Sequence, residues 1–305
     1  MKKQNIFIDT DMGNDDIMAI AQLLLYPSIN ITGISVVNGV ATKTSGYNNL
    51  LNILNYLQLS IPSQIGYQKP MKQTGASFPS RDIERANNLT LLENLSIKKT
   101  SKNYSSFRLI EDFIYQKVSQ NQTTILALGP LTNLAKTTQK FGKEFTKNVK
   151  QIVMMGGAIK KGNVAPNFIA EYNIFLDPEA AQIVFSSGIP ILMVGIDATN
   201  FAKVTKKFVN EIRRTQPSDK KAKIIKEIIV NNDNDFSAFY DPLTAYILKN
   251  PTFITKQMEC SIKVSLKGKS RGQTIPVVSK NPNVNVILAV NPTKFYNQMK
   301  EFMVK

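Results

Sequence analysis

The sequence predicts an α/β protein with a doubly wound, mostly parallel β-sheet flanked by helices. Short apolar runs alternate with helical segments along most of the 305 residues. These runs are continuously apolar, as expected for strands that are buried on both faces. Alternating strands and helices are typical of right-handed crossovers between parallel strands. With 43% hydrophobic and 20% charged residues, the chain has the composition of a globular protein rather than a disordered one.

Five strands and five helices are expected in the first two thirds of the chain. The predicted strands span residues 6–8, 31–37, 124–128, 151–155 and 191–194. The predicted helices span residues 16–25, 45–57, 106–119, 131–138 and 178–186. The last helix has clear start signals, because Asp177 can cap free backbone N–H groups and Pro178 suits the first helical position.

Extra helices and strands are expected toward the C-terminus. Residues 203–249 are predicted to be mainly helical, and Pro251 follows them. The remaining predictions are strands over 260–266, 274–278 and 284–290 and a closing helix from Pro292. Because no internal repeat or low-complexity linker divides the chain, we expect a single domain over residues 1–305.

The composition excludes several kinds of chemistry. The chain has no histidine, no tryptophan and one cysteine, Cys260. Without imidazole, Ser-His-Asp and Cys-His mechanisms and histidine-ligated zinc are excluded. A single cysteine also excludes an internal disulfide and a cysteine metal cluster. Catalysis must therefore use carboxylates, amides and hydroxyls, with or without a hard cation.

A net charge of +16 indicates either an anionic partner or a lysine-rich surface. The basic residues form only short runs, such as 98–99, 160–161 and 220–221. They are not interleaved with aromatic residues as in known RNA-binding motifs. We therefore expect no nucleic-acid partner, although a nucleic-acid-associated protein stays an alternative hypothesis.

No membrane partner is expected either. The longest apolar stretch, residues 17–31, is interrupted by Pro27 and is too short to span a bilayer. The N-terminus runs directly into the first predicted strand, which leaves no room for a signal peptide. These features predict a cytoplasmic protein, although an exported mature form whose leader had been removed would have the same sequence.

Four carboxylates converge where the first predicted strand meets the first helix. Asp9 and Asp11 end the strand, Gly13 permits a tight turn, and Asp15 and Asp16 begin the helix. Open α/β sheets bind ligands at this end of their strands. The helix dipole would favour Asp15 or Asp16 alone, but four neighbouring like charges raise one another's pKa values unless a cation neutralises them. The pattern predicts a hard divalent ion with oxygen ligands.

An Asp-x-Asp at a strand end also suggests a haloacid-dehalogenase-type phosphatase with Asp9 as nucleophile and Mg²⁺ as cofactor. That pattern expects Thr or Val where this chain has Gly13. It also gives no role to the pair Asp15 and Asp16. The match to the phosphatase pattern is therefore poor.

Further motifs follow the acidic segment DTDMGNDD at residues 9–16. They are LGPLTN at 128–133, MMGG at 154–157, GN at 162–163, AEYN at 170–173, DPEAA at 177–181 and YDPL at 240–243. In type and order this set resembles the motifs of the inosine-uridine-type nucleoside hydrolases, which are calcium-dependent N-ribohydrolases. The matches extend from residue 6 to about residue 248, and several ordered matches are specific evidence.

The resemblance implies a Ca²⁺ ion on the carboxylates of Asp11, Asp16 and Asp241 and on the backbone carbonyl of Leu128. These oxygens, with water and the ribose 2′- and 3′-hydroxyls, suit the coordination of calcium. The implied nucleophile is a water activated by calcium, whose proton Asp11 or a neighbouring carboxylate accepts. The implied transition state resembles an oxocarbenium ion.

The resemblance assigns ribose binding to Asp15, Met155, Asn163, Glu171 and Asn173. Glu171 and Asn173 suit sugar hydroxyls, because a carboxylate accepts hydrogen bonds and an amide both accepts and donates them. Taken alone, the two asparagines would more often be turn or cap residues, and Met155 would be a core residue.

The sequence departs from the family pattern around the base. Tyr240 occupies the position where many members carry the histidine that protonates the departing base, and a phenol with a pKa near 10 is a weaker acid. Other members stack the base between tryptophans; here Phe78 and Tyr240 are the available aromatic rings. Residues 37–39 read Val-Asn-Gly where many relatives have Gly-Asn; either Asn38 takes over the amide contact or that contact is lost.

Two functions follow from these residues. The first is a hydrolase that cleaves ribonucleosides into free base and ribose. The alternative is a catalytically weak or silent relative that binds a nucleoside, because the leaving-group acid is missing. In both cases the partner is a small nucleoside, and the resemblance implies a homodimer or homotetramer.

Overall fold

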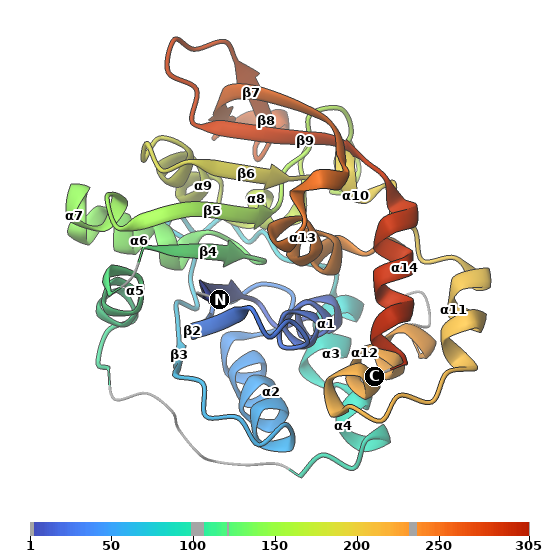
Figure 1. Ribbon diagram of the computed structural model, residues 1–305. Coiled ribbons are helices and arrows are strands. Elements are labelled where there is room, and N and C mark those ends of the chain that lie inside the picture. Colours follow the sequence, from blue (N-terminus) through green and yellow to red (C-terminus); the bar gives the residue numbers. More distant parts are fainter. Residues whose placement is uncertain (1–2, 99–106, 121, 232–236, 305) are drawn as a thin grey trace.

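The computed structural model describes residues 3–98, 107–120, 122–231 and 237–304. A nine-stranded sheet forms its centre, in the order β3-β2-β1-β4-β5-β6-β9-β7-β8 (Figure 1). The strands are β1 (Gln4–Thr10), β2 (Ile29–Val36), β3 (Ser63–Ile65), β4 (Thr123–Ala127), β5 (Val149–Met155), β6 (Ile191–Val194), β7 (Ile254–Val264), β8 (Thr274–Val277) and β9 (Val284–Val290). The strands from β3 to β9 in this order are parallel, whereas β7 is antiparallel to both of its neighbours.

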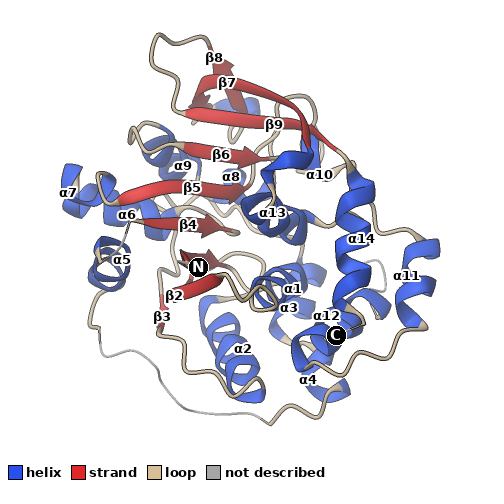
Figure 2. Cartoon of the chain, viewed as in Figure 1, coloured by secondary structure: helices blue, strands red, loops and turns tan. Residues whose placement is uncertain are grey.

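Helices cover both faces of the sheet (Figure 2). They are α1 (Asn14–Leu23), α2 (Lys43–Tyr56), α3 (Ser80–Asn87), α4 (Thr90–Asn94), α5 (Ile110–Ser119), α6 (Thr132–Phe141), α7 (Lys143–Thr146), α8 (Tyr172–Leu176), α9 (Pro178–Phe185), α10 (Ile196–Thr199), α11 (Lys206–Arg213), α12 (Lys220–Val230), α13 (Tyr240–Lys249) and α14 (Pro292–Phe302). Short 3₁₀ turns span Pro251–Phe253 and Gly268–Ser270.

Alternate residues of β1 pack into two separate apolar cores, one on each face of the sheet. Ile6 and Ile8 pack into a buried cluster with α1, α2, α12, α13 and α14. Phe7 points to the other face, into a cluster with α5, α6 and α9. Successive side chains of a strand point to opposite faces, so a continuously apolar strand lies between two helical layers. The predicted doubly wound fold is confirmed.

Most predicted elements are present with shifted ends. The strands over 191–194 and 284–290 have the predicted bounds, but β7 begins at Ile254, six residues before the predicted start. The helix expected over 106–119 begins at Ile110, and residue 106 lies outside the described residues. Region 203–249 contains α11, α12 and α13, with residues 232–236 likewise outside the description.

Helix α1 is buried on almost every side, because its residues from Ile17 to Leu23 are apolar except for Gln22. All of its residues from Asp16 to Leu23 are buried. It packs against α12 and against α13. Asp16 and Asp241 lie in the first turns of α1 and α13, where the positive end of each helix dipole favours a negative charge. Two segments separated by more than two hundred residues thus meet at one site.

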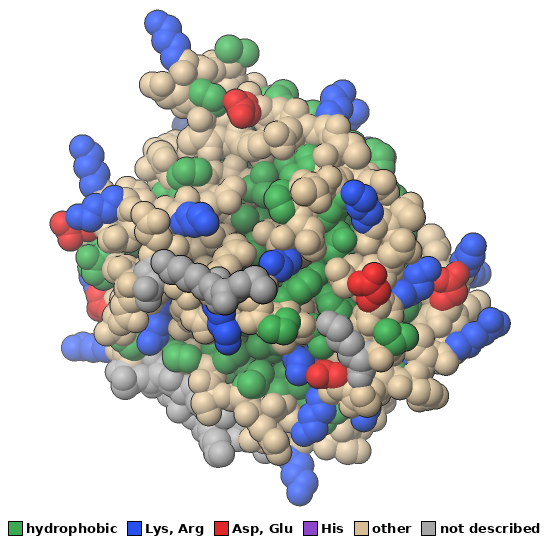
Figure 3. Space-filling model, viewed as in Figure 1, with side chains coloured by type: hydrophobic (Ala, Val, Ile, Leu, Met, Phe, Trp, Pro, Cys, Tyr) green, Lys and Arg blue, Asp and Glu red, His purple; other side chains and the backbone are tan. Residues whose placement is uncertain are grey.

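Basic side chains are dispersed over the face of the molecule in Figure 3, with acidic side chains between them. In the part of the chain that the structure describes, no helix combines the length and apolar character needed to cross a bilayer.

Candidate active site

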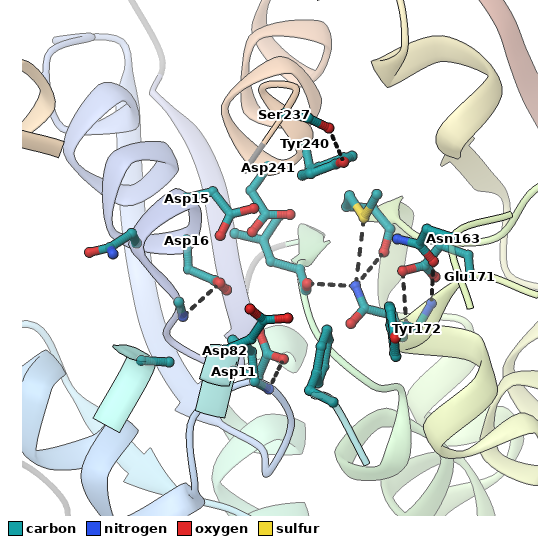
Figure 4. Close-up of a pocket in the computed structure, with 18 residues that line it drawn as sticks. Asp11, Asp15, Asp16, Asp82, Asn163, Glu171, Tyr172, Ser237, Tyr240 and Asp241 are labelled. Carbon is teal, nitrogen blue, oxygen red and sulfur yellow. Dashed lines mark hydrogen bonds between the residues drawn. The ribbon is translucent and has the colours of Figure 1, made fainter. Parts of the chain in front are cut away.

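A pocket of about 380 Å³ opens where the parallel strands end. Its wall is formed by Asp11, Gly13, Asn14, Asp15, Asp16, Val40, Phe78, Asp82, Ala86, Leu128, Met155, Asn163, Glu171, Tyr172, Asn173, Ser237, Tyr240 and Asp241. This volume falls within the range of small-molecule sites, and the position is the ligand-binding edge of an open α/β sheet. Figure 4 shows the carboxylates on one side of the pocket and the Glu171 segment on the other.

Carboxylates from both ends of the chain meet in this pocket. Oxygens of Asp15, Asp16 and Asp241 lie within 4.8 Å of one another. Asp11, Asp16 and Asp241 are buried. Burial, followed by the charge of Asp16, raises the pKa of both Asp11 and Asp241 well above the usual range of aspartate. Such a cluster favours the binding of positive charge.

The turn between β1 and α1 fixes the carboxylate of Asp16. The hydroxyl of Thr10 donates a hydrogen bond to Asp16 Oδ1, and the backbone N–H of Gly13 donates one to Oδ2 over 2.9 Å. Asp16 is therefore held by its own capping turn at the N-terminus of the helix. Its orientation is set before any ligand binds.

The loop after β2 holds Asp11. The backbone N–H of Val40 donates a hydrogen bond of 2.7 Å to Asp11 Oδ2. Gly39 packs so closely that a Cβ atom there would lie 2.0 Å from the same oxygen. Only glycine permits this approach of backbone to carboxylate.

The donor atoms at this edge fit a hard divalent cation. The carboxylates of Asp11, Asp16 and Asp241 supply only oxygen, which is the ligand type that such ions prefer. Leu128 lines the same pocket. Its carbonyl accepts a hydrogen bond from Asn173 Nδ2 over 2.9 Å, and a carbonyl oxygen has a second lone pair. Asp15 also lies within the tight carboxylate group, although the resemblance assigned it to ribose.

Glu171 lies opposite the aspartate cluster (Figure 4) and forms a hydrogen-bond network with Asn173. Glu171 Oε2 accepts a hydrogen bond from the Gly157 N–H over 2.9 Å, and Oε1 accepts one from the Asn173 N–H over 3.0 Å. Burial raises the pKa of Glu171, and these N–H groups oppose that rise. Asn173 Nδ2 donates to the carbonyls of Leu128 and Met155. The ends of β4 and β5 are thereby joined.

Aromatic and hydroxyl groups form another part of the wall. Phe78 stacks on Tyr172, with ring centroids 4.6 Å apart and an interplanar angle of 20°. The Tyr240 hydroxyl lies 3.1 Å from Ser237 Oγ. Burial is the main cause of the raised pKa of Tyr240. This wall can contact a planar ring.

The polar and aromatic wall residues that sequence reasoning did not assign to the site include Tyr172, Ser237 and Asp82. Tyr172 lies between the two motif residues Glu171 and Asn173, so its place in the motif was a usable signal. Asp82 follows Phe78 by four residues, at the start of α3, which was a weaker signal. For Ser237 nothing in the sequence indicated a place in the site other than its position three residues before Tyr240.

Two expected members of the site lie elsewhere. Asn38 does not line the pocket; its side-chain carbonyl accepts a hydrogen bond of 3.3 Å from the Lys43 N–H at the start of α2. Asp9 also lies outside the pocket, because Ser35 and Asn133 donate hydrogen bonds of 2.5 and 2.8 Å to its Oδ1. The expectation that Asp9 joins the carboxylate cluster is wrong, and with it the phosphatase alternative that used Asp9 as nucleophile.

The order of the motifs along the chain, and the meeting of most of them in one pocket, agree with a known protein family. The family model of the inosine-uridine preferring nucleoside hydrolases matches residues 6–297. The chain belongs to this family. It is therefore a nucleoside hydrolase, an enzyme that acts on N-glycosyl bonds, and its partner is a small nucleoside. Members of the family generally depend on a metal ion, which agrees with the acidic cluster.

Relatives of this nucleoside hydrolase cover its full length. It is 28% identical to a pyrimidine-specific ribonucleoside hydrolase, RihB, of Escherichia coli O1:K1 / APEC, over 99% of this chain and 97% of the relative. It is 25% identical to a purine-preferring ribonucleoside hydrolase from Gardnerella vaginalis, with a TM-score of 0.81 and 98% of both chains covered. A nucleoside hydrolase from Bacillus anthracis, 21% identical with a TM-score of 0.84, covers 98% of this chain and 99% of its own and has the same fold.

Proposed function

We propose that this nucleoside hydrolase cleaves ribonucleosides into free base and ribose and that it uses Ca²⁺. One observation carries the proposal: buried carboxylates from both ends of the chain meet at the strand ends, with no Lys or Arg among the described residues of the wall. In this assignment Asp11, Asp16, Asp241 and the Leu128 carbonyl hold the ion. When bound, calcium would supply Lewis-acid activation of a water and binding of sugar hydroxyls.

The side chains have separate roles in the proposed reaction. Asp11 accepts the proton of the attacking water as general base. Asp15 and Glu171 accept hydrogen bonds from ribose hydroxyls, while Asn163 and Asn173 place polar groups beside the sugar. The surrounding carboxylates stabilise the positive charge that develops on the ribose in an oxocarbenium-like transition state.

The groups near the base complete the proposed reaction. Met155 supplies an apolar contact beside the sugar. Phe78 offers its ring to the base, and Tyr240 is the group placed to act on the departing nitrogen, with its hydroxyl near Ser237. A phenol holds its proton tightly at neutral pH, so proton transfer to the base is expected to limit the rate for neutral bases.

The proposal is tested by measuring reducing sugar released from a panel of ribonucleosides, with and without a calcium chelator. We expect release that stops with the chelator and returns with Ca²⁺. Asp11→Ala should abolish both ribose release and metal binding, whereas Asp112→Ala, on the exposed side of α5, should change neither. Unchanged turnover of Asp11→Ala would contradict the mechanism.

A silent nucleoside-binding relative is the second candidate. This candidate is favoured because Tyr240 and Ser237 place hydroxyl groups where a stronger acid would be expected to protonate the departing base. The same assay separates the candidates, because a silent relative would bind nucleosides in a calorimetric titration and release no sugar.

Three further expectations complete the proposal. We expect a single domain, because β9 and α14 near the C-terminus complete the sheet and core that β1 begins. We expect a homodimer or homotetramer, to be measured by light scattering, and the exposed Ile275, Val277 and Val278 at the edge of the sheet are candidates for the contact. We also expect a cytoplasmic location.

A further inference from the structure

The charge of the pocket is opposite to that of the molecule. The chain carries a net charge of +16 and has no histidine. Yet the described wall contains six carboxylates and neither a lysine nor an arginine. Four of the carboxylates, Asp11, Asp15, Asp16 and Asp241, form the cluster that suits a metal, and Glu171 is engaged by backbone N–H groups. The sixth, Asp82, has no role in the proposed hydrolysis.

Asp82 lies beside the aromatic part of the wall. It is half-buried in the first turn of α3, four residues after Phe78. Its negative charge raises the pKa of the Tyr172 hydroxyl, second only to the effect of burial. Tyr172 in turn stacks on Phe78. Figure 4 shows the Asp82 carboxylate directed into the pocket. A carboxylate and a stacked aromatic pair thus share the region where a planar ring can bind.

These two features favour the same kind of ring. The faces of aromatic rings attract cations through their quadrupole. A carboxylate that is partly removed from water attracts a positive charge over several ångströms. A ring with a fixed positive charge would gain from both contacts, whereas a neutral ring would gain mainly from stacking.

We infer that this site accepts ribonucleosides whose base is cationic, such as N-ribosyl pyridinium compounds and N7-methylated purine ribosides. This inference rests on the proposed ribonucleoside hydrolysis and specifies its substrate class. Asp82 is the specificity-determining residue.

The chemistry of a cationic base also removes the need for an acid. The bond between C1′ and the ring nitrogen breaks, and its electron pair cancels the positive charge of the ring. The base leaves as a neutral molecule. Water forms the new bond to C1′, and its proton passes to a carboxylate and then to solvent. A neutral base must instead be protonated as it leaves, and the donors on the described wall near the rings are weakly acidic hydroxyls.

The test compares matched substrates with the full-length, calcium-supplemented enzyme. The values of kcat/KM for 7-methylguanosine and guanosine are measured at about pH 6, and each is divided by the rate of the uncatalysed reaction. Nicotinamide riboside and uridine form a second comparison. We expect the corrected value for the cationic substrate to be at least about tenfold higher in each comparison.

The Asp82→Asn variant assigns the preference to one side chain. It should reduce the ratio of cationic to neutral kcat/KM by about tenfold. Glu84→Gln, an exposed carboxylate on the same helix outside the pocket wall, should leave the ratio unchanged. If Asp82→Asn does not fold, inhibition of the wild type supplies the readout, because cationic 1-methylnicotinamide should inhibit more strongly than neutral nicotinamide.

The outcomes separate the two proposals. Hydrolysis of the neutral ribonucleosides without a cationic preference, or with a preference that Asp82→Asn leaves intact, would overturn the inference and leave the proposed function standing. Release of ribose from none of the four substrates would contradict the proposed function itself.

Discussion

The position of the Asp11 carboxylate depends on Gly39, a neighbour without a side chain. A Cβ at position 39 would lie 2.0 Å from Asp11 Oδ2 and 2.6 Å from its Cβ. These distances are far below van der Waals contact, so either the loop or the carboxylate must move. Because Asp11 is buried, it has little room to yield.

We therefore expect Gly39→Ala to lower both metal affinity and kcat by at least about tenfold, since small displacements of reacting groups are costly. Calorimetric titration with Ca²⁺ and the reducing-sugar assay measure the two effects. Gly33→Ala is the control, because the atoms nearest to its Cβ would be side-chain atoms at 3.1–3.2 Å, and Gly33 does not line the pocket. Equal metal affinity in wild type and Gly39→Ala would show that the loop adapts freely.

Asn173 supplies a second prediction at the residue scale. Its amide N–H groups face the carbonyl oxygens of Leu128 and Met155 at 2.9 and 3.2 Å. Asn173→Asp would place an acceptor against these two acceptors in a buried site. We expect it to lower the free energy of unfolding by about 2–3 kcal/mol, measured by urea unfolding in chelator.

The matched control for this change is Asn167→Asp. The Asn167 amide also donates to a backbone carbonyl, that of Lys269, but the residue is exposed. Its replacement should cost less than about 0.5 kcal/mol. Similar losses in the two variants would mean that burial of Asn173 does not determine the effect.

Sequence motifs located the site residues that lie close together along the chain, such as Asp15 with Asp16 and Glu171 with Asn173. Asp82 was missed because it enters the pocket from a helix outside every motif. Asn38 was misplaced because the local sequence does not show whether a side chain after β2 turns toward the pocket or toward the start of α2.

At the scale of elements, an ion pair ties the turn between β7 and β8 to helix α9. Arg271 donates two hydrogen bonds of 2.8 Å to the carboxylate of Glu179 and another to the Leu266 carbonyl. The side chains are 13% and 20% exposed. This two-pronged geometry is the strong form of an ion pair. The hydrogen bond from Arg271 is the main reason that the pKa of Glu179 is lowered.

We expect Glu179→Gln to lower the free energy of unfolding at pH 7 by about 1–2 kcal/mol. A lowered folded-state pKa means that the unfolded chain binds protons more readily. The stabilisation is therefore complete above the ordinary pKa of 4.5 and is lost as the pH falls through the folded-state value. Thermal unfolding between about pH 3 and 7 should show a smaller acid-induced loss in Glu179→Gln than in wild type.

Glu259→Gln, an exposed substitution on β7, is the control for this pH dependence and should follow the wild type. A Glu179→Gln variant with the same acid-induced loss as the wild type would show that the ion pair contributes no stability.

Helices and strands could be predicted where one sequence signal, such as a continuous apolar run or a capping residue, was strong. The central strands are continuously apolar because both faces are covered, and Asp177 begins α9 by accepting a hydrogen bond from the Ala180 N–H over 3.1 Å. Strand β3 was missed because it has only three residues and depends on pairing with β2. The early start of β7 was missed because residues 255–257 are exposed and polar, so only pairing with β9 extends the strand.

For the whole molecule, metal binding and folding are expected to be coupled. The carboxylates of Asp11, Asp16 and Asp241 come from opposite ends of the chain and are brought together only in the folded state. An ion that binds the folded state alone stabilises it by about 2.7 kcal/mol at a free concentration 100 times its Kd. We expect Ca²⁺ to raise the Tm by a few degrees.

The measurement is thermal unfolding with chelator and with increasing free Ca²⁺. Asp241→Asn should lose most of the increase, while Asp112→Asn should keep it. An increase of the same size in Asp241→Asn would place the ion elsewhere.

The distance in sequence between α1 and α13 also affects when the acidic cluster can form during protein synthesis. A ribosome completes Asp11 and Asp16 early, but it must add more than two hundred further residues before Asp241 emerges. A nascent chain, or a fragment that ends before α13, carries Asp11, Asp15 and Asp16 but lacks Asp241. We therefore expect the proposed metal site, and the hydrolysis that would depend on it, to be complete only after Asp241 has been synthesised.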